Sequence, residues 1–236
     1  MTPENKEGFR LFASSNYPNE VCALLVIQKG IETLFRCENI AKEKKSNFII
    51  SPESYAQADS LGEIVGIVHS HTTGRAKPSE ADLVSCEAHG LPWVIYSTQY
   101  DSWYEFNPTG YRAGLVGRPF SYGVLDCFSL VRDYYKEKLS IEVMDFPRVD
   151  EDAFKKGQSL YEENLEQAGF KKVSELQKHD VILMQLGHKV PCHAAIYLGD
   201  DLILHHLRGR LSSRDVYGGL YKKTTRFFCR YFGVNK

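Results

Sequence analysis

Glu63-Ile64-Val65-Gly66-Ile67-Val68-His69-Ser70-His71 is the stretch that decides the fold of the first half of this chain. The residues before His69 are mostly apolar and β-branched, which predicts a buried strand. Because side chains alternate between the two faces of a strand, His69 and His71 project to the same side at its end. A helix is predicted next, from Ser79 to about His89, and polar residues at its start can face the histidines across the loop.

Asp82 completes a set of candidate metal ligands at this strand end. With His69 and His71 it offers two imidazoles and one carboxylate, the kind of set that holds a catalytic zinc while a fourth position stays open. Metal-assisted hydrolysis also needs a base and a donor to the oxyanion. Glu20, which precedes another predicted strand, is the candidate base, and the Ser79 hydroxyl is the candidate donor.

Two simpler interpretations compete with a metal site. Ser79 and Asp82 are spaced as in a helix capping box, which needs no metal. His69 and His71 could be ordinary polar residues at a strand end. All five polar residues at the right spacing after a buried strand favour the metal site over either alternative.

Composition excludes several other classes of protein. The 236 residues are enough for one large domain or for two of ordinary size, and 43% hydrophobic with 25% charged residues is typical of a soluble globular protein. A net charge of −1 gives no reason to expect a nucleic-acid partner. We expect no signal peptide and no membrane span, because the first residues are polar and no apolar run is long enough. The scattered cysteines, with no CxxC pair, favour free thiols.

Periodicity predicts α+β structure in both halves. In the first half we expect helices over 4–13, 51–60 and 79–89, and strands over 21–28, 31–37, 46–50, 63–68, 93–97 and 102–106. Residues 107–119 hold several glycines and prolines with little periodicity, which indicates a domain boundary. In the second half we expect helices from residue 127 and over 159–168, and strands of an antiparallel sheet over 181–186, 193–198, 201–206 and 226–232.

Cys127 is the candidate centre of a second site. It stands at a predicted helix start, where the helix dipole lowers the pKa of a thiol and favours the nucleophilic thiolate. A thiolate peptidase also needs a histidine and a group that orients it. His193 begins one strand and His205 ends the next, so a hairpin brings them together, although His206 could replace His205. Cys192 is not expected to join His193, because adjacent strand residues face opposite ways.

The residues of the first half resemble a known family. Glu20 followed by H-x-H-x7-S-x2-D, here His69, His71, Ser79 and Asp82, resembles the JAMM (MPN-type) metalloprotease signature. The resemblance implies a cytidine-deaminase-like mixed sheet with flanking helices, and zinc held by the two histidines and the aspartate. It also implies a base at Glu20, oxyanion help from Ser79, and cleavage of peptide or isopeptide bonds, often at ubiquitin-like tails.

The second half resembles the NlpC-type, papain-like peptidoglycan endopeptidases. The matching strings are Asp126-Cys127 and His193-Ala194-Ala195-Ile196-Tyr197-Leu198-Gly199, followed by His205. The resemblance implies that Cys127 is the nucleophile, His193 the base and His205 the orienting residue. The chain departs from the family pattern at Phe128 and in the short approach to the cysteine, where Tyr122 is only a weak candidate for the oxyanion side.

The order of the two domains resembles the tail-assembly proteins of lambdoid siphophages. On that resemblance we expect a JAMM-type domain over 1–108, a linker over 109–118 and an NlpC-type domain over 119–236. The implied partners are other tail tip proteins and the peptidoglycan stem peptide, and the implied locations are the host cytoplasm during assembly and the virion tail tip. The alternatives are a structural tail component whose catalysis is dispensable and a ubiquitin-like deconjugase.

Overall fold

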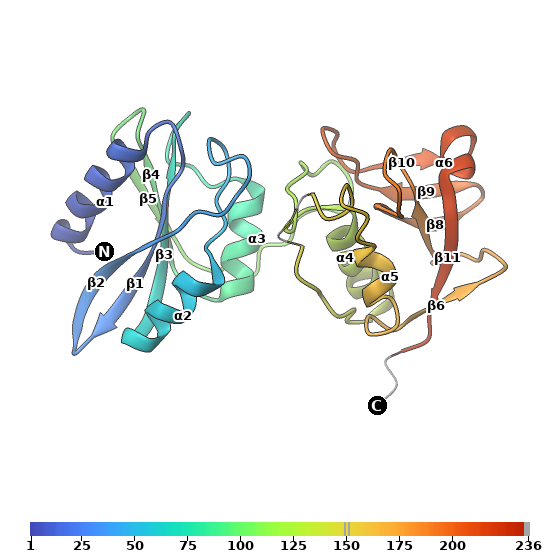
Figure 1. Cartoon of the computed structure of the whole chain (residues 1–236), viewed down its shortest axis with the longest axis horizontal. Coiled ribbons are helices and arrows are strands. Elements are labelled where there is room, and N and C mark those ends of the chain that lie inside the picture. The colour runs from blue at the N-terminus through green and yellow to red at the C-terminus, as the bar shows by residue number, and fades with distance from the viewer. Residues whose placement is uncertain (149, 151, 234–236) are drawn as a thin grey trace. The chain divides into compact units, whose positions relative to one another are not determined.

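The computed structural model describes residues 1–148, 150 and 152–233, and the chain divides into two compact units, Met1–Arg112 and Ala113–Lys236 (Figure 1). The division falls inside the stretch 109–118, where the sequence predicts a linker. Each unit has its own sheet with helices packed on it, so the expectation of two α+β domains is confirmed. Among the described residues, no helix is long and apolar enough to cross a membrane.

The first unit is a mixed sheet with the strand order β2-β1-β3-β4-β5. The strands are β1 (Cys22–Gln28), β2 (Ile31–Cys37), β3 (Glu63–His71), β4 (Trp93–Ser97) and β5 (Ser102–Phe106). The helices are α1 (Pro3–Asn16), α2 (Pro52–Leu61) and α3 (Glu80–His89). The β3–β4 pair is parallel and the others are antiparallel, which confirms the predicted mixed sheet.

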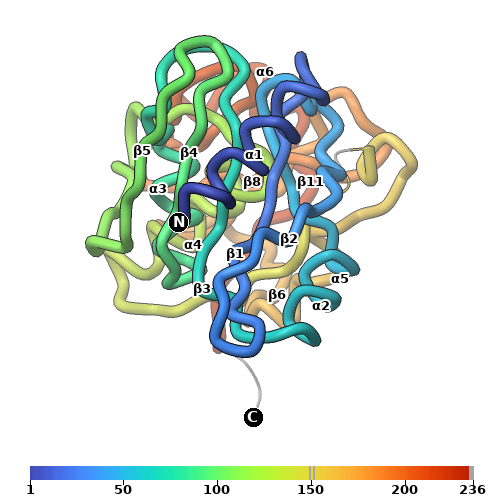
Figure 2. The backbone as a smooth tube through the Cα atoms, turned by 90° about the vertical axis from the view of Figure 1, so that its left-hand side faces the viewer, coloured from blue at the N-terminus to red at the C-terminus, as the bar shows by residue number. Residues whose placement is uncertain are grey.

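Alternation along the strands gives this sheet two apolar faces. Ala23 and Leu25 of β1 pack with residues of α1, which lies across the strands in Figure 2. Leu24 of β1 and Ile67 of β3 point the other way and pack with residues of α2 and α3. His69 lies two residues beyond Ile67, so it shares the face that α3 covers. The strand pattern therefore places the histidine beside the start of that helix.

The prediction of a strand over 46–50 is wrong. Only an isolated bridge forms there, between Asn39 and Ile50. The side chain of Asn39 replaces a strand partner, because its Oδ1 accepts hydrogen bonds from the amides of Ala41 at 3.0 Å and Ile49 at 3.1 Å. A side chain thus closes this loop, which apolar patterning does not predict.

The second unit is an antiparallel sheet with the strand order β10-β9-β8-β7-β11-β6. The sequence predicts that this sheet is antiparallel. The strands are β6 (Phe170–Val173), β7 (Val181–Met184), β8 (His193–Gly199), β9 (Leu202–His205), β10 (Ser213–Val216) and β11 (Thr225–Tyr231). The helices are α4 (Cys127–Leu139), α5 (Leu160–Asn164) and α6 (Gly219–Thr224). The sequence did not predict β6, β10 or α6, and α5 is shorter than expected because turns replace its last residues.

Helix α4 covers one face of this sheet. Its apolar residues form one buried cluster with Leu183 of β7 and with Ala194 and Ile196 of β8. The residues that alternate with them, including Ala195, pack on the opposite face beside Tyr221 of α6. Cys127 at the start of α4 belongs to the first cluster, so it lies next to the beginning of β8.

Candidate metal and cysteine sites

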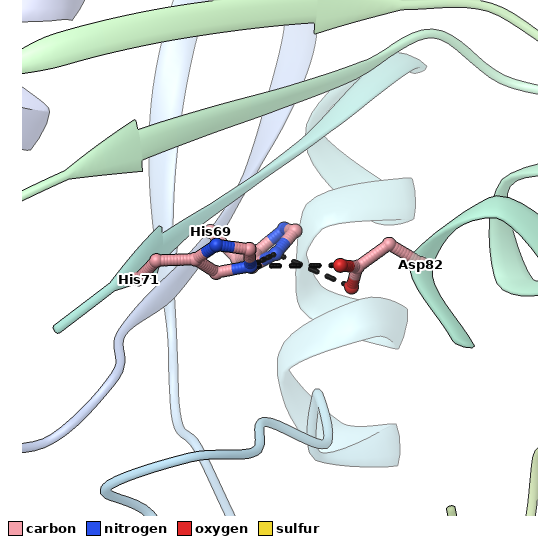
Figure 3. Close-up of side chains that lie close together, drawn as sticks. All are labelled: His69, His71 and Asp82. Carbon is pink, nitrogen blue, oxygen red and sulfur yellow. Dashed lines mark hydrogen bonds and ion pairs between the residues drawn. The ribbon is translucent and has the colours of Figure 1, made fainter. Parts of the chain in front are cut away.

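The end of β3 and the start of α3 bring His69, His71 and Asp82 together (Figure 3). The two histidine Nε2 atoms are 3.1 Å apart. The Nε2 of His69 is 3.3 Å from Oδ1 of Asp82, and the Nε2 of His71 is 3.5 Å from Oδ2. Among the described residues these three form the group whose ligand atoms all lie within 4.8 Å of one another.

The spacing of these atoms fits a zinc ion. Zinc bonds to histidine and carboxylate ligands are about 2.0–2.1 Å long, and tetrahedral angles then put ligand atoms roughly 3.3 Å apart. The Nδ1 of His71 lies 3.4 Å from the carbonyl oxygen of Arg75. A carbonyl oxygen can only accept, so this contact requires a proton on Nδ1. A proton on Nδ1 leaves the lone pair of a neutral imidazole on Nε2, facing the other two ligands.

Aromatic rings hold His69 in place. The ring of Phe48 stacks on it with a centroid distance of 4.4 Å, and Trp93 meets it edge-on at 5.5 Å. The imidazole is 1% exposed, and burial lowers its pKa to about 4 although Asp82 acts in the opposite direction. His69 is therefore neutral at ordinary pH, as a metal ligand must be.

Ser79 and Asp82 form a capping box as well as part of the ligand group. Both the amide and the hydroxyl of Ser79 donate to Oδ2 of Asp82 at 2.7 Å, and the amide of Asp82 donates to the Ser79 hydroxyl at 3.1 Å. Burial alone would raise the pKa of Asp82, but His69, His71 and the Ser79 hydrogen bonds outweigh it and hold this pKa below its usual range. The two interpretations of this motif are thus compatible, since the cap aims the carboxylate at the histidines.

Glu20 lies just before β1 and is buried. Its amide donates to the carbonyl of Lys44 at 2.6 Å, and its carbonyl accepts from Asn39 at 2.8 Å, so its backbone is fixed on both sides. Burial raises the pKa of its carboxyl to about 8, with the charge of His71 opposing and that of Asp82 adding to the rise. The charges of His71 and Asp82 therefore act on the Glu20 carboxyl.

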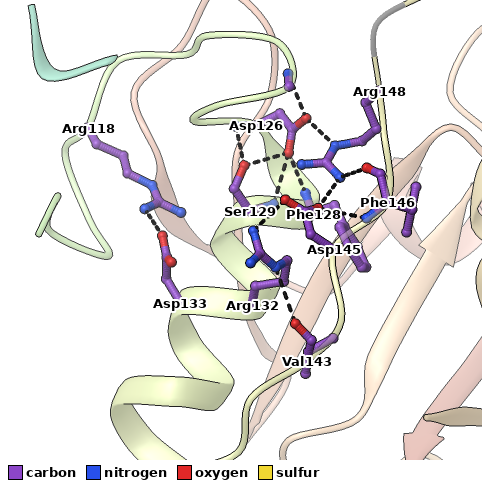
Figure 4. A network of polar contacts seen from close by, with 11 residues as sticks. Arg118, Asp126, Phe128, Ser129, Arg132, Asp133, Val143, Asp145, Phe146 and Arg148 are labelled. Atoms are coloured by element: carbon purple, nitrogen blue, oxygen red, sulfur yellow. Dashed lines mark hydrogen bonds and ion pairs between the residues drawn. The ribbon is translucent and has the colours of Figure 1, made fainter. Parts of the chain in front are cut away.

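The start of α4 rests on a buried ion pair (Figure 4). Asp126 caps this helix, and its Oδ1 accepts from the amides of Phe128 at 3.0 Å and Ser129 at 2.9 Å. Its Oδ2 accepts from Nε of Arg148 at 2.7 Å, and both side chains are no more than 3% exposed. This network fixes the first turn of the helix and with it the position of the next residue, Cys127.

The thiol of Cys127 is hydrogen-bonded to a tyrosine rather than to a histidine. Its Sγ lies 3.0 Å from the hydroxyl of Tyr161, and in the described part of the chain no hydrogen bond joins it to His193. Burial raises the pKa of Cys127 to about 12, with the charge of Asp126 adding to the rise, while the hydrogen bonds from Tyr161 and the Ala194 amide lower it. The expectation that the helix start lowers this pKa is therefore wrong, because burial dominates.

The two predicted histidines do meet, and an aspartate follows them. Nε2 of His193 lies 3.0 Å from Nδ1 of His205, and Nε2 of His205 lies 3.1 Å from Oδ2 of Asp215. Burial lowers the pKa of His193 to about 3, and the neighbouring histidines act in the same direction. The structure thus brings together His193 and His205, the predicted base and its predicted orienting residue.

Tyr122 and His206, the alternatives considered in the sequence, lie elsewhere. The hydroxyl of Tyr122 donates to the carbonyl of Asp150 at 3.2 Å. His206 is buried, and its ring meets that of Phe120 edge-on with a centroid distance of 5.1 Å. In this geometry His205, rather than His206, is the partner of His193.

Sequence reasoning missed Tyr161, Asp215 and Arg148. Tyr161 reaches Cys127 only through packing between distant segments, which carries no local signal. Asp215 lies on β10, whose short polar sequence does not resemble a buried strand. A weak signal existed for Arg148, since a buried acidic cap such as Asp126 needs a basic partner.

Comparisons with known proteins agree with the two units. Residues 5–109 match the family model described as prokaryotic homologs of the JAB domain, and residues 117–230 match the NlpC/P60 family. The fold and these matches define a two-domain chain in which a JAB domain precedes an NlpC/P60 domain.

Similarity over the whole length narrows this class to one family. The chain is 35% identical over 237 residues to the tail tip assembly protein K of Escherichia phage N15, covering 99% of this chain and 97% of that protein. It is 40% identical over 184 residues to the tail tip assembly protein K of Escherichia phage lambda, covering 77% of this chain and 89% of that protein. The chain belongs to the family of the tail tip assembly protein K of lambdoid phages.

Part of the chain is also similar to solved structures. A JAB1/MPN domain protein from Archaeoglobus fulgidus is 27% identical, with 46% of this chain and 87% of that chain covered and a TM-score of 0.31.

Proposed function

We propose that this tail tip assembly protein has two hydrolase sites. One is a zinc-dependent peptidase or isopeptidase in the first unit, and the other is a cysteine endopeptidase in the second unit that acts on peptidoglycan stem peptides. The observation that carries the zinc half of the proposal is the ligand-like triangle of His69, His71 and Asp82, whose nitrogen and oxygen atoms lie 3.1–3.5 Å apart. The cysteine half is carried by the contact of His193 with His205 at 3.0 Å.

In the zinc site, His69, His71 and Asp82 would hold the ion. When bound, zinc supplies Lewis-acid chemistry that polarises the scissile carbonyl and makes a water molecule more acidic. Glu20 is the proposed base, because its carboxyl is buried within reach of the charges of the ligand group. Ser79 keeps Asp82 aimed at the histidines, and its hydroxyl is the proposed donor to the oxyanion once substrate is bound.

In the cysteine site, Cys127 is the proposed nucleophile and His193 the base. The thiol must give up its proton to a histidine before attack, so it has to exchange its hydrogen bond with Tyr161 for one with His193. Catalytic hydrogen bonds are often long or misaligned before substrate binds and tighten in the complex. The thiol already lies beside β8, at the amide of Ala194 next to His193.

The family supplies the setting for these reactions. Its members are tail tip assembly proteins, so the proposed partners are other tail tip proteins and the proposed location is the host cytoplasm during assembly. The match to the NlpC/P60 family supports peptidoglycan as the substrate of the second site. Presence at the virion tail tip would bring that site to the cell wall at infection.

Two inhibitors of different chemistry test whether the sites are separate. We expect the purified chain to cleave a soluble stem tetrapeptide after treatment with a chelator but not after treatment with iodoacetamide, because only the second site uses a thiol. Mass spectrometry of the products measures the cleavage. Cys127→Ala should lower the rate at least about 1,000-fold, whereas Cys192→Ala, which removes a half-buried thiol of the same unit, should not. Cleavage that survives in Cys127→Ala would contradict the assignment.

A structural role without catalysis is the second candidate function. It is favoured by the buried thiol of Cys127, whose hydrogen bond is with Tyr161 and whose pKa is high. The double variant His69→Ala with Cys127→Ala separates the candidates in a phage complementation assay. Catalysis predicts that infectious titre falls while the variant chain is still produced in folded form. Normal titre and normal tails would show that binding surfaces matter more than turnover.

A further inference from the structure

Two hydrogen bonds in series connect β8, β9 and β10. The first joins Nε2 of His193 to Nδ1 of His205 at 3.0 Å, and the second joins Nε2 of His205 to Oδ2 of Asp215 at 3.1 Å. The register explains the series, because Ser213 of β10 lies opposite His205. Asp215 is two residues further along the strand and so faces the same side.

The carboxylate decides where the protons of this series lie. An ionised carboxylate only accepts hydrogen bonds, so the Nε2 of His205 must carry a proton. In a neutral imidazole the other nitrogen is then an acceptor, and Nδ1 of His205 accepts from Nε2–H of His193. The same rule leaves the lone pair of His193 on Nδ1. Hydrogen bonds hold the pKa of Asp215 below its usual value despite partial burial, so the carboxylate is ionised.

We propose that Asp215 is a positioning residue that fixes the tautomers of both histidines and so makes Nδ1 of His193 the base of the cysteine site. This rests on the proposed cysteine peptidase function.

Asp215 is itself held before any substrate binds. Its Oδ1 accepts from the hydroxyl of Ser213 at 3.0 Å, and its Oδ2 accepts from the hydroxyl of Tyr221 at 3.0 Å. Arg210 lies 3.4 Å from the same Oδ2. The side chain of Asp215 is 22% exposed while that of His205 is 1% exposed. The carboxylate is therefore the end of the series that lies nearer to solvent, and His205 in the middle is shielded from water.

The proposed tautomers give a balanced first step. The Sγ–H bond of Cys127 breaks and its proton goes to Nδ1 of His193, while the sulfur bonds to the carbonyl carbon and the π pair moves to the oxygen. When the C–N bond breaks, the leaving amine takes the proton back from His193. Between these events the imidazolium is stabilised by His205 and, through it, by the charge of Asp215.

Asp215→Asn tests the proposal, because the amide has the shape of the carboxylate but lacks its charge. On the stem tetrapeptide we expect kcat to fall about 10- to 100-fold with KM unchanged, which is less than the roughly 10,000-fold loss when the group next to the base is neutralised in a serine protease. Nitrogen-15 NMR of the imidazoles should show Nε2–H tautomers of His193 and His205 in the wild type and a mixture in the variant.

A control variant separates positioning from folding. Asp200→Asn makes the same chemical change in the β8–β9 turn, outside the series of hydrogen bonds. It should keep the wild-type tautomers and kcat within about twofold. Unchanged tautomers in Asp215→Asn would overturn the proposal. If the wild type cleaved no stem peptide but its tautomers still depended on Asp215, the peptidase function would fail and the positioning role at the histidines would stand.

Discussion

Asp126→Ala should lower the free energy of unfolding of the second unit by about 3–5 kcal/mol, the loss expected when one partner of a buried ion pair is removed. The carboxylate of Asp126 accepts from the first amides of α4 and from Arg148, and both charged side chains are almost fully buried. The variant leaves the Nε of the buried Arg148 guanidinium without a partner, while its Nη1 keeps the ion pair with Asp145 at 2.7 Å. It also removes the cap that starts the helix of Cys127.

The distribution of tryptophan makes this measurement selective. Both tryptophans of the chain, Trp93 and Trp103, lie in the first unit, so their fluorescence follows the unfolding of that unit only. Far-UV circular dichroism follows both units. In urea, the dichroism signal that fluorescence does not follow reports the second unit, and Asp126→Ala should move its unfolding midpoint to a lower urea concentration. The fluorescence transition should keep its wild-type midpoint.

Glu142→Ala is the matched control for this prediction. Glu142 forms an exposed ion pair with Lys136 of α4, and such pairs contribute at most about 1 kcal/mol. The double variant Asp126→Asn with Arg148→Met should recover part of the loss, since it removes both charges. A loss in Asp126→Ala no larger than in Glu142→Ala would show that the ion pair does not fix the start of α4.

The candidate metal site was predictable because it is local in sequence. His69 and His71 share a face of one strand, and Asp82 lies on the first turn of the next helix, so alternation and helix capping alone bring the three together. Only Glu20 comes from a distant segment. The same local rules predicted the sheet and helices of this unit except at residues 46–50, where the side chain of Asn39 decides the structure.

The cysteine site was only partly predictable because burial and distant contacts decide it. The hairpin of β8 and β9 brings His193 to His205, which spacing predicts. The raised pKa of Cys127 depends on how deeply α4 packs, and its contact with Tyr161 spans 34 positions in sequence. No periodicity reports such packing, so the sequence identified the candidate catalytic groups better than their protonation state.

Asp82→Ala should abolish zinc binding to the first unit. After dialysis the wild-type chain should retain about one zinc ion, measured by plasma emission against protein concentration. The variant keeps His69 and His71 but loses the only anionic ligand. Loss of a group that hydrogen-bonds to a metal ligand lowers metal affinity roughly 10- to 100-fold, and loss of the ligand Asp82 itself should lower the zinc affinity by more than that. A wild-type chain that holds no zinc after reconstitution would contradict the metal site.

Ser79→Ala distinguishes a lost ligand from a lost helix cap. Asp82 has both roles, because its Oδ2 closes the capping box with Ser79 while its Oδ1 faces His69. Ser79→Ala removes the two hydroxyl hydrogen bonds of the cap at a cost of about 1 kcal/mol. The backbone amide of residue 79 still donates to Oδ2 and keeps the carboxylate in place. We therefore expect Ser79→Ala to retain most of its zinc while Asp82→Ala loses it. Equal loss in both variants would mean that the helix start, and not the carboxylate, holds the site together.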